Sequence, residues 1–287
     1  MPLIQTEKLT HVYSKGTPFE RVAIENIDLT LEHGECLGII GHTGSGKSTF
    51  IQHLNGLLKP TSGHVYYNGR DIHETKQSML ETRFKVGLVF QYPEYQLFES
   101  TVFADIAFGP KNMGLSESEV QERVHEAAGF AKLEPSLLEK SPFELSGGQK
   151  RRAAIAGVIA MRPEVLILDE PTAGLDPAGR DEIITNIMSY KRAHNATIIM
   201  VTHSMEEIAK TADRILLFHN GHIEMDDTPQ SVFAEVERLT EMGLSAPKAA
   251  LIAARLRTLG LPIERDIYTI EQLTSALKEI KAGGARA

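Results

Sequence analysis

The chain has 287 residues, which is enough for one or two domains with a sizeable buried core. Its 38 acidic residues outnumber its 30 basic residues and give a net charge of −8, which disfavours general nucleic-acid binding. The single cysteine, Cys36, excludes disulfides within the chain, so we expect a buried thiol in a reducing cytosol. No stretch approaches the length of a membrane-spanning helix and the N-terminus does not resemble a signal peptide, so other chains should supply any membrane-spanning part.

The first part of the chain predicts strands that lead into a glycine-rich turn. Residues 3–36 alternate between apolar and polar side chains, which indicates antiparallel strands separated by a loop at residues 14–20. The apolar run at residues 36–40 is followed by G-H-T-G-S-G-K-S, which fits the phosphate-loop pattern G-x-x-x-x-G-K-[ST]. Residues 49–54 can open a helix, and the order strand, glycine turn, helix is the context that this motif requires.

The glycine turn is suited to a triphosphate for an electrostatic reason. Glycines let backbone N–H groups turn toward one point, where the N-terminus of the next helix adds partial positive charge. Lys47 should reach the β- and γ-phosphates, and the Ser48 hydroxyl should hold Mg²⁺. The predicted phosphate-binding residues are Gly41, His42, Thr43, Gly44, Ser45, Gly46, Lys47, Ser48 and Thr49.

The middle of the chain is predicted to be mostly helical. A hairpin at residues 65–67, closed by an Asn-Gly turn, precedes residues 71–143, in which residues 117–132 have apolar side chains at helical spacing. Another helix, rich in arginine and alanine, is expected at residues 150–162. This part should therefore contribute helices rather than strands.

Three strand-like stretches follow, at residues 165–168, 197–202 and 214–219. Helical segments alternate with them, which is the pattern of a parallel sheet. The chain changes character near residue 228, where we place a soft boundary. Beyond it we expect helices at residues 248–259 and 270–281 and a frayed tail at residues 282–287.

An acidic pair follows the first of these stretches. A buried strand would deliver Asp169 and Glu170 at its C-terminal end, where open parallel sheets keep their sites. Asp169 can bind the water shell of Mg²⁺ opposite Ser48, and Glu170 can polarise an attacking water as general base. A solvated strand end is the alternative, but the phosphate loop upstream favours the functional interpretation.

The sequence L-S-G-G-Q at residues 145–149 precedes the helix expected from Lys150. Ser146 is a good N-cap and two glycines again expose backbone N–H groups, so this is a second anion-binding helix start. By itself the motif could be an ordinary helix cap. In combination with the phosphate loop and the acidic pair, however, the chain resembles the ATP-binding cassette (ABC) ATPase family, whose signature sequence is L-S-G-G-Q.

The resemblance covers about residues 3–227 and implies an α/β fold. It implies a P-loop NTPase core with a parallel sheet, an N-terminal antiparallel β subdomain and an α-helical signature subdomain at about residues 92–160. Residues 1–227 would form the nucleotide-binding domain, and residues 228–287 would form a small C-terminal helical extension for dimerisation. The implied nucleotide is ATP with Mg²⁺.

Further residues acquire roles from the same resemblance. Gln91 matches the Q-loop glutamine, a ligand of Mg²⁺ and water that senses the transmembrane partner, and His203 matches the switch histidine that contacts the γ-phosphate. Tyr13 occupies the position where the family stacks an aromatic ring on adenine, although a tyrosine in such a strand is often a core residue. The implied catalytic residues are Lys47, Gln91, Glu170 and His203, the metal ligands are Ser48, Gln91 and Asp169, and the signature residues are Ser146, Gly147, Gly148 and Gln149.

The family also implies a partner. The signature of one subunit caps the nucleotide of the facing subunit, so two ATP molecules should lie between two head-to-tail cassettes. Residues 174–176 match the D-loop, which touches the opposite subunit. ATP would then hold the dimer closed, and hydrolysis would let it open.

The stretch that follows the Q-loop glutamine narrows the resemblance. Residues 91–98 and 105–110 are similar to those of the energy-coupling factor (ECF) branch and the related cobalt and nickel importers, and residues 142–144 and 172–177 to those of the second (A′) ECF ATPase. The resemblance implies a membrane T component docked near residues 91–98 and an S component that selects the vitamin or micronutrient. The aromatic and apolar side chains expected in the docking groove are Tyr92, Tyr95, Leu97 and Phe98.

This resemblance implies a peripheral protein at the cytoplasmic face of the cell membrane. One alternative is the cassette of another ABC importer, either a cobalt or nickel importer or an uptake system for another metal ion or an amino acid. The branches that take up other metal ions or amino acids usually lack Pro-Glu-x-Gln after the Q-loop glutamine. A second alternative is a cassette protein that works on DNA or the ribosome. Such proteins usually carry coiled-coil inserts or tandem cassettes, which this sequence lacks.

Overall fold

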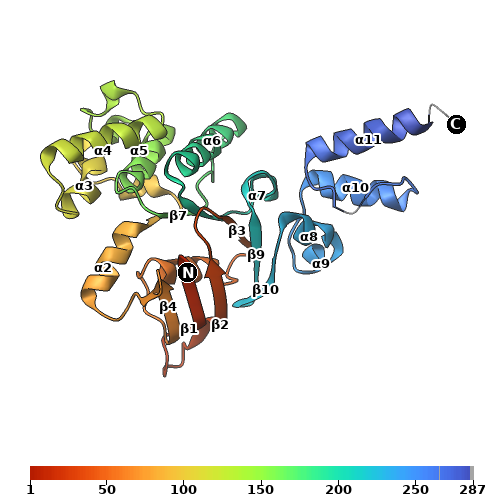
Figure 1. The fold of residues 1–287 in the computed structure, drawn as a ribbon, viewed down its shortest axis with the longest axis horizontal. Coiled ribbons are helices and arrows are strands. Elements are labelled where there is room, and N and C mark those ends of the chain that lie inside the picture. Colours follow the sequence, from red (N-terminus) through yellow and green to blue (C-terminus); the bar gives the residue numbers. More distant parts are fainter. Residues whose placement is uncertain (265, 285–287) are drawn as a thin grey trace. The chain divides into compact units, whose positions relative to one another are not determined.

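The computed structural model describes residues 1–264 and 266–284, with the side chains described up to residue 281 (Figure 1). The chain divides into two compact units. The first unit contains Met1–Glu35 and Ser48–Val201, and the second contains Cys36–Lys47 and Thr202–Ala287. Helix α1 (Lys47–Leu54) has residues in both. In the described part of the chain, no helix combines the length and the apolar character needed to cross a bilayer.

The first unit contains a four-stranded antiparallel sheet in the order β2-β1-β4-β5 (Figure 1). Its strands are β1 (Ile4–Tyr13), β2 (Arg21–Leu31), β4 (Ser62–Tyr67) and β5 (Arg70–Asp71). The turn between β4 and β5 has positive φ at both its Asn and its Gly, as an Asn-Gly hairpin turn requires. The predicted antiparallel strands and the predicted hairpin are therefore both confirmed.

The first unit also holds three parallel strands with β7 (Val165–Asp169) in the middle. Strand β7 pairs with β6 (Val86–Val89) on one side and with β8 (Thr197–Val201) on the other. Every residue of the three strands is buried, which explains why β7 and β8 are continuous apolar runs rather than alternating ones. Strand β6 interrupts a region that was predicted to be mostly helical, because four apolar residues are too few to show a period.

Helices α3, α4 and α5 of the first unit pack against one another (Figure 1). Helix α4 is confirmed but ends two residues before the predicted position. Helix α5 begins three residues earlier than predicted, so that both glycines of the signature lie within its first turn. The helices of this unit after α1 are α2 (Lys76–Lys85), η1 (Pro93–Gln96), α3 (Val102–Asn112), α4 (Glu117–Phe130), η2 (Pro135–Leu137), η3 (Pro142–Glu144), α5 (Gly147–Ile159) and α6 (Pro177–His194).

The second unit contains β3 (Cys36–Gly41), which runs parallel to β9 (Arg214–His219). Strand β9 turns back into the antiparallel β10 (His222–Asp227), and α7 (Met205–Thr211) packs against β3. Cys36 is buried at the start of β3, as predicted. Strand β10 was not predicted, because its sequence H-I-E-M-D-D is mostly polar and most of its residues are exposed or half-buried.

Four helices complete the second unit. Helices α10 and α11 are confirmed, and they pack around a small apolar cluster formed by Ala249, Ala253, Ile263, Ile267 and Leu273. The two six-residue helices before them were not predicted, since they are too short for a helical period. Helix α11 continues through the first three residues of the tail that was expected to fray, and residues 285–287 lie outside the described residues. The helices are α8 (Pro229–Ala234), α9 (Val236–Glu241), α10 (Lys248–Thr258) and α11 (Ile270–Gly284).

Candidate functional site

The predicted phosphate loop connects β3 to α1 in the order strand, turn, helix. Three of its glycines have positive φ: 151° at Gly41, 82° at Gly44 and 107° at Gly46. A Cβ atom at Gly41 would lie 2.4 Å from the backbone oxygen of Phe218, so the loop backbone passes too close to β9 for any larger residue. The local context that the motif requires is therefore present.

Two side chains of the loop are held in the way that a phosphate site needs. The buried Lys47 ammonium donates to the backbone oxygens of Gly41 (2.7 Å) and His42 (3.0 Å), which keeps its charge at the loop. Ser45 is fully buried, and its hydroxyl has no hydrogen-bond partner within the described residues. A buried hydroxyl is costly unless it is satisfied, so this one fits a ligand that supplies a hydrogen-bond partner. A phosphate oxygen would do so.

The predicted magnesium ligands Ser48 and Asp169 lie together in the first unit. The Ser48 hydroxyl, in the first turn of α1, donates to Oδ2 of Asp169 at 3.1 Å. Asp169 is the buried last residue of β7. Hydroxyl and carboxylate oxygens are hard ligands of the kind that Mg²⁺ prefers, so the pair fits that ion. The third predicted ligand, Gln91, follows the end of β6 and is exposed.

Glu170 occupies a strained backbone position directly after β7. Its φ is 52°, in the left-handed region that residues other than glycine rarely adopt. Two hydrogen bonds hold it there: its N–H donates to the backbone oxygen of Val201 (2.8 Å), and its own oxygen accepts from the N–H of Ala173 (3.2 Å). Strain of about 1–3 kcal/mol is retained where the surrounding structure fixes it. Glu170 is only 9% exposed, so its carboxylate is largely shielded from water.

Tyr13 ends strand β1 and is 41% exposed, which argues against the core interpretation of this residue. Its hydroxyl lies 3.2 Å from Oγ1 of Thr49, in the first turn of α1. Its ring lies edge-on to His11, with ring centroids 4.5 Å apart. An accessible aromatic ring next to the helix that follows the phosphate loop is suited to stacking on a nucleotide base.

The signature residues begin helix α5 with a reciprocal cap. Ser146 accepts from the N–H of Gln149, and the Gln149 side chain accepts from the N–H of Ser146 at 2.9 Å. A Cβ atom at Gly147 or at Gly148 would meet no atom within 4 Å, so packing inside this chain does not require glycine at either position. The open space leaves room for a group from outside the chain to approach the helix start.

His203 is exposed, directly before the N-cap residue Ser204 of α7. It belongs to the second unit, as do residues 41–47 of the loop, whereas Ser48, Asp169, Glu170 and the signature belong to the first. Each unit thus brings its own part of the predicted site residues together.

One buried residue of this region was not predicted. Arg151 is 4% exposed, and its guanidinium forms a two-pronged contact with the carboxylate of Glu94, through Nε (3.1 Å) and Nη2 (2.8 Å). A signal was available in the sequence, because Arg151 precedes Ile155 and Ile159 at spacings of four and eight residues on the same buried helical face. A charge on an apolar stripe indicates a buried partner.

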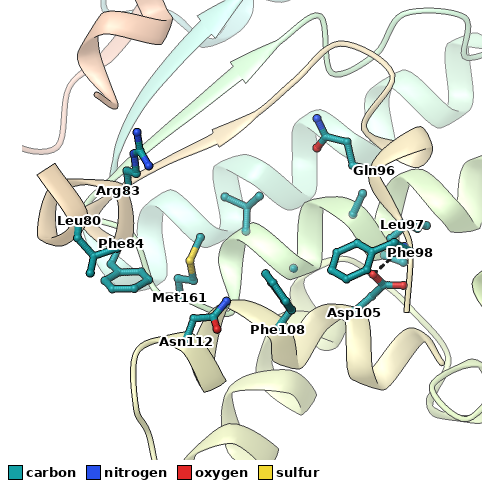
Figure 2. Close-up of a pocket in the computed structure, with 15 residues that line it drawn as sticks. Leu80, Arg83, Phe84, Gln96, Leu97, Phe98, Asp105, Phe108, Asn112 and Met161 are labelled. Atoms are coloured by element: carbon teal, nitrogen blue, oxygen red, sulfur yellow. Dashed lines mark hydrogen bonds between the residues drawn. The ribbon is translucent and has the colours of Figure 1, made fainter. Parts of the chain in front are cut away.

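A groove of about 700 Å³ lies in the first unit, lined by residues of α2, α3, α5 and residues 96–98 (Figure 2). Leu97 and Phe98 line it, as predicted for the docking surface. Tyr92 and Tyr95 are not among the lining residues, and Tyr95 is 85% exposed. The lining side chains that the sequence did not reveal are chiefly apolar, and they include Leu80, Phe84, Phe108 and Met161.

Asp105 is the acidic group in this groove. It accepts hydrogen bonds from the backbone N–H groups of Phe98 (3.1 Å) and Glu99 (3.3 Å), as Figure 2 shows for the first of these. Burial raises the pKa of Asp105, and these two hydrogen bonds only partly offset that effect. The groove is therefore apolar with one acidic side chain at its edge.

The sequence also matches a known protein family. The ABC transporter family matches residues 24–173. The chain is 55% identical to the energy-coupling factor transporter ATP-binding protein EcfA2 of Caldanaerobacter subterraneus subsp. tengcongensis, over 94% of each chain. It is 54% identical to the protein of the same name from Clostridium tetani, over 96% of each chain.

Two solved structures are similar as well. One is cbiO1 from Clostridium perfringens, described as part of the ABC transporter complex cbiONQ, with a TM-score of 0.73 and 38% identity over 84% of this chain and 94% of that one. The other is the dimeric structure of MJ0796, a bacterial ABC transporter cassette, with a TM-score of 0.71 and 28% identity over 79% of this chain and 98% of that one. The chain therefore belongs to the ABC transporter ATP-binding family and, within it, to the energy-coupling factor transporter ATP-binding proteins.

Proposed function

We propose that this chain binds and hydrolyses ATP to energise an ECF-type importer of vitamins or other micronutrients. The chain is an ABC-type ATPase coupled to transport. The observation that carries the proposal is the hydrogen bond between Ser48 and Asp169, which joins the helix after the phosphate loop to the carboxyl end of a buried parallel strand. Nucleotide sites in open parallel sheets occupy this position.

In the proposed reaction the glycine-lined loop binds the phosphates of ATP. Backbone N–H groups of residues 41–47 and the Lys47 ammonium would neutralise the negative charge that builds up on the γ-phosphate, and Tyr13 would stack on the adenine. Most of the rate enhancement in phosphoryl transfer comes from such positioning and charge stabilisation. Ser48 and Asp169, with Gln91 as a third ligand, would hold a Mg²⁺ ion, which supplies charge neutralisation at the phosphates when bound.

Two residues would act on the water and on the γ-phosphate. Glu170 would accept the proton of the attacking water. The fixed backbone at this position supports that role, because it restricts the orientations that the carboxylate can adopt. His203 would contact the γ-phosphate through its ring N–H. Lys47, Gln91, Glu170 and His203 are thus the proposed catalytic residues.

The signature would act on the nucleotide of a second cassette in a head-to-tail dimer. The open space at Gly147 and Gly148 supports this role, because these glycines leave the α5 N-terminus accessible to a phosphate group. We also propose that residues 228–287 form a dimerisation extension beyond the nucleotide-binding domain of residues 1–227. Exposed apolar side chains on its last two helices, Ile252, Ile270 and Leu277, support that proposal.

The membrane components would be a T component docked in the groove near residues 91–98 and an S component that selects the substrate. The apolar lining of the groove supports docking of a helix from the T component. The chain would then lie at the cytoplasmic face of the membrane as a peripheral subunit. A cobalt or nickel importer is the second candidate, because residues 91–98 and 105–110 also resemble those of such importers.

Purification of the tagged full-length chain from native membranes, followed by mass spectrometry, tests the proposal. We expect an integral membrane protein and a second cassette to copurify, with Mg²⁺-dependent ATPase activity in the complex. Isolation of the chain only as a free ATPase without a membrane protein would contradict it. A DNA titration at several salt concentrations tests the nucleic-acid alternative, for which the net charge of −8 predicts no salt-dependent binding.

A further inference from the structure

A single buried guanidinium connects the groove side of the first unit with the turn that carries Glu170. Arg151, on α5, donates through Nε and Nη2 to the two carboxylate oxygens of Glu94 at 3.1 and 2.8 Å. Its remaining nitrogen, Nη1, donates to the backbone oxygen of Ala173 at 2.5 Å. One side chain therefore holds two separate segments against the signature helix.

Each of these segments belongs to a different part of the proposed machinery. Glu94 lies in η1, whose last residue, Gln96, lines the groove together with Leu97 and Phe98. Ala173 closes the turn that begins at Glu170, because its N–H donates to the Glu170 oxygen. A displacement of η1 would therefore shift the Arg151 guanidinium through its bonds to Glu94. The shifted guanidinium would in turn displace the turn that orients the Glu170 carboxylate.

Burial makes this connection stiff. The Arg151 side chain is 4% exposed and that of Glu94 is 16% exposed, so neither charge can be transferred to water without breaking the contact. Arginine stays protonated in proteins. Burial would raise the pKa of Glu94, but hydrogen bonds from Arg151 and from its own backbone, together with the Arg151 charge, bring that pKa below its ordinary value. The pair thus stays charged, and separating it leaves a buried charge without a counterion.

We propose that Arg151 is a positioning residue that couples the occupancy of the groove to the orientation of Glu170. The inference rests on the proposed function, in which the groove takes a membrane partner and Glu170 is the general base. Coupling between two sites is reciprocal, so nucleotide binding must also change the position or surroundings of η1. That second direction can be measured on the full-length chain alone.

The chain contains no tryptophan, so one introduced tryptophan is a unique reporter. Tyr95 is in η1 and highly exposed, and Tyr95→Trp adds only a larger aromatic ring at that position. We expect the fluorescence of this reporter to change when Mg²⁺ and a non-hydrolysable ATP analogue are added. In the reporter chain with Arg151→Gln the change should be lost, while equilibrium dialysis still shows binding of the analogue.

Two further variants separate positioning from folding. Glu94→Gln keeps the shape of the partner and removes its charge, and Arg151→Lys keeps the charge and removes the two-pronged geometry. Both should lower kcat for ATP by about tenfold or more and leave KM nearly unchanged, because displacement of a reacting group by about 1 Å can cost up to 10²-fold. Circular dichroism melting shows whether each variant is folded.

Arg162→Gln is the matched control. Arg162 also bonds two carboxylates, those of Glu126 (2.7 Å) and Glu122 (2.9 Å), and none of its hydrogen bonds among the described residues goes to η1 or the Glu170 turn. We expect it to keep both the fluorescence change and kcat. The coupling would be overturned if the fluorescence of the reporter did not change on nucleotide binding. It would also be overturned if the fluorescence changed equally in folded reporter chains that carry Glu94→Gln or Arg151→Lys. Absence of ATPase activity from the unsubstituted chain would instead refute the proposed function.

Discussion

Helices α1 and α5 both begin beside glycines, but the two helix starts are built differently. Before α1 the glycines have positive φ, and a Cβ atom at Gly41 would strike the backbone oxygen of Phe218. At α5 the glycines lie inside the helix, and Cβ atoms there would meet nothing within 4 Å. Gly41 before α1 is required by the chain's own backbone, whereas no contact among the described residues requires glycine at Gly147 or Gly148.

The comparison suggests a division of tasks between the two helix starts. The start of α1 has a lysine and a buried hydroxyl, and its Ser48 contacts a carboxylate suited to Mg²⁺, so we expect it to bind phosphate groups with Mg²⁺ and without a second chain. The start of α5 offers only backbone N–H groups, since its Ser146 and Gln149 side chains are used in their own cap. We expect ATP binding to depend on the start of α1, and partner-dependent ATP hydrolysis to depend on the starts of both α1 and α5.

The largest expected effect separates binding from hydrolysis. Glu170→Gln should lower kcat by on the order of 10²-fold or more, because the general base is lost. ATP binding should persist, since the α1 loop is untouched. Steady-state hydrolysis and equilibrium dialysis with labelled ATP measure the two effects on the same preparation. Unchanged turnover in the folded variant would refute the assignment of Glu170 as the general base.

The α1 helix should also be sensitive to acid, whereas α5 contains no histidine. Burial lowers the pKa of His53 to about 4 from 6.5. Above pH 6.5 the imidazole is neutral in both states, and between 6.5 and about 4 the unfolded chain binds the proton more readily than the folded one. Stability should therefore fall with pH across that window, by up to about 3 kcal/mol.

Urea unfolding of the full chain at pH 7, 5.5 and 4 measures this effect, with His53→Gln as the control. Other groups titrate in the same range, so the informative quantity is the difference in the free energy of unfolding between the two proteins. We expect His53→Gln to become more stable relative to the unsubstituted chain as the pH falls. A difference that does not vary with pH would show that His53 is not held neutral by burial.

Gly41→Ala should destabilise the folded chain by about 2 kcal/mol, because a methyl group in this position overlaps a backbone oxygen that cannot move cheaply. It should also weaken ATP binding, since the loop must shift. Thermal melting and nucleotide dialysis measure both effects. If the variant were as stable as the original chain, the distinction drawn between the two helix starts would be wrong.

The smallest expected effect has the opposite sign. Gly148→Ala should stabilise the chain by roughly 0.5–1 kcal/mol, because alanine is the better residue within a helix. Binding of ATP to the single chain should be unchanged, while ATP-dependent dimerisation, followed by size-exclusion chromatography, should weaken because the methyl group occupies the open space. Destabilisation by Gly148→Ala would indicate that this glycine serves internal packing after all.

Much of this architecture could be predicted from the sequence, for reasons that are local. The phosphate loop, the strands β7, β8 and β9 and the long helices each carry a strong signal within a few residues. Ser48 and Asp169 could be paired because open parallel sheets keep their sites at the carboxyl ends of strands, where Asp169 ends β7. The start of α5 at Gly147 was missed because glycine usually argues against a helix, and the cap formed by Ser146 and Gln149 outweighs that preference.

What could not be predicted depends on long-range contacts. The ion pair between Arg151 and Glu94 joins residues 57 positions apart, and the groove is lined by residues from three helices. The sequence predicts Tyr95 as a groove residue, but Tyr95 is 85% exposed and is not among the residues that line the groove. Only the packed structure distinguishes Leu97 and Phe98 from their aromatic neighbours.

The backbone at Glu170 has a consequence for how this protein can be improved. A glycine at that position would adopt the same φ of 52° without strain, so the fold itself would gain from losing the glutamate. Searches for heat-resistant variants should therefore recover inactive chains altered at this residue. The protein would thus give up some stability at a position where its proposed chemistry needs a carboxylate.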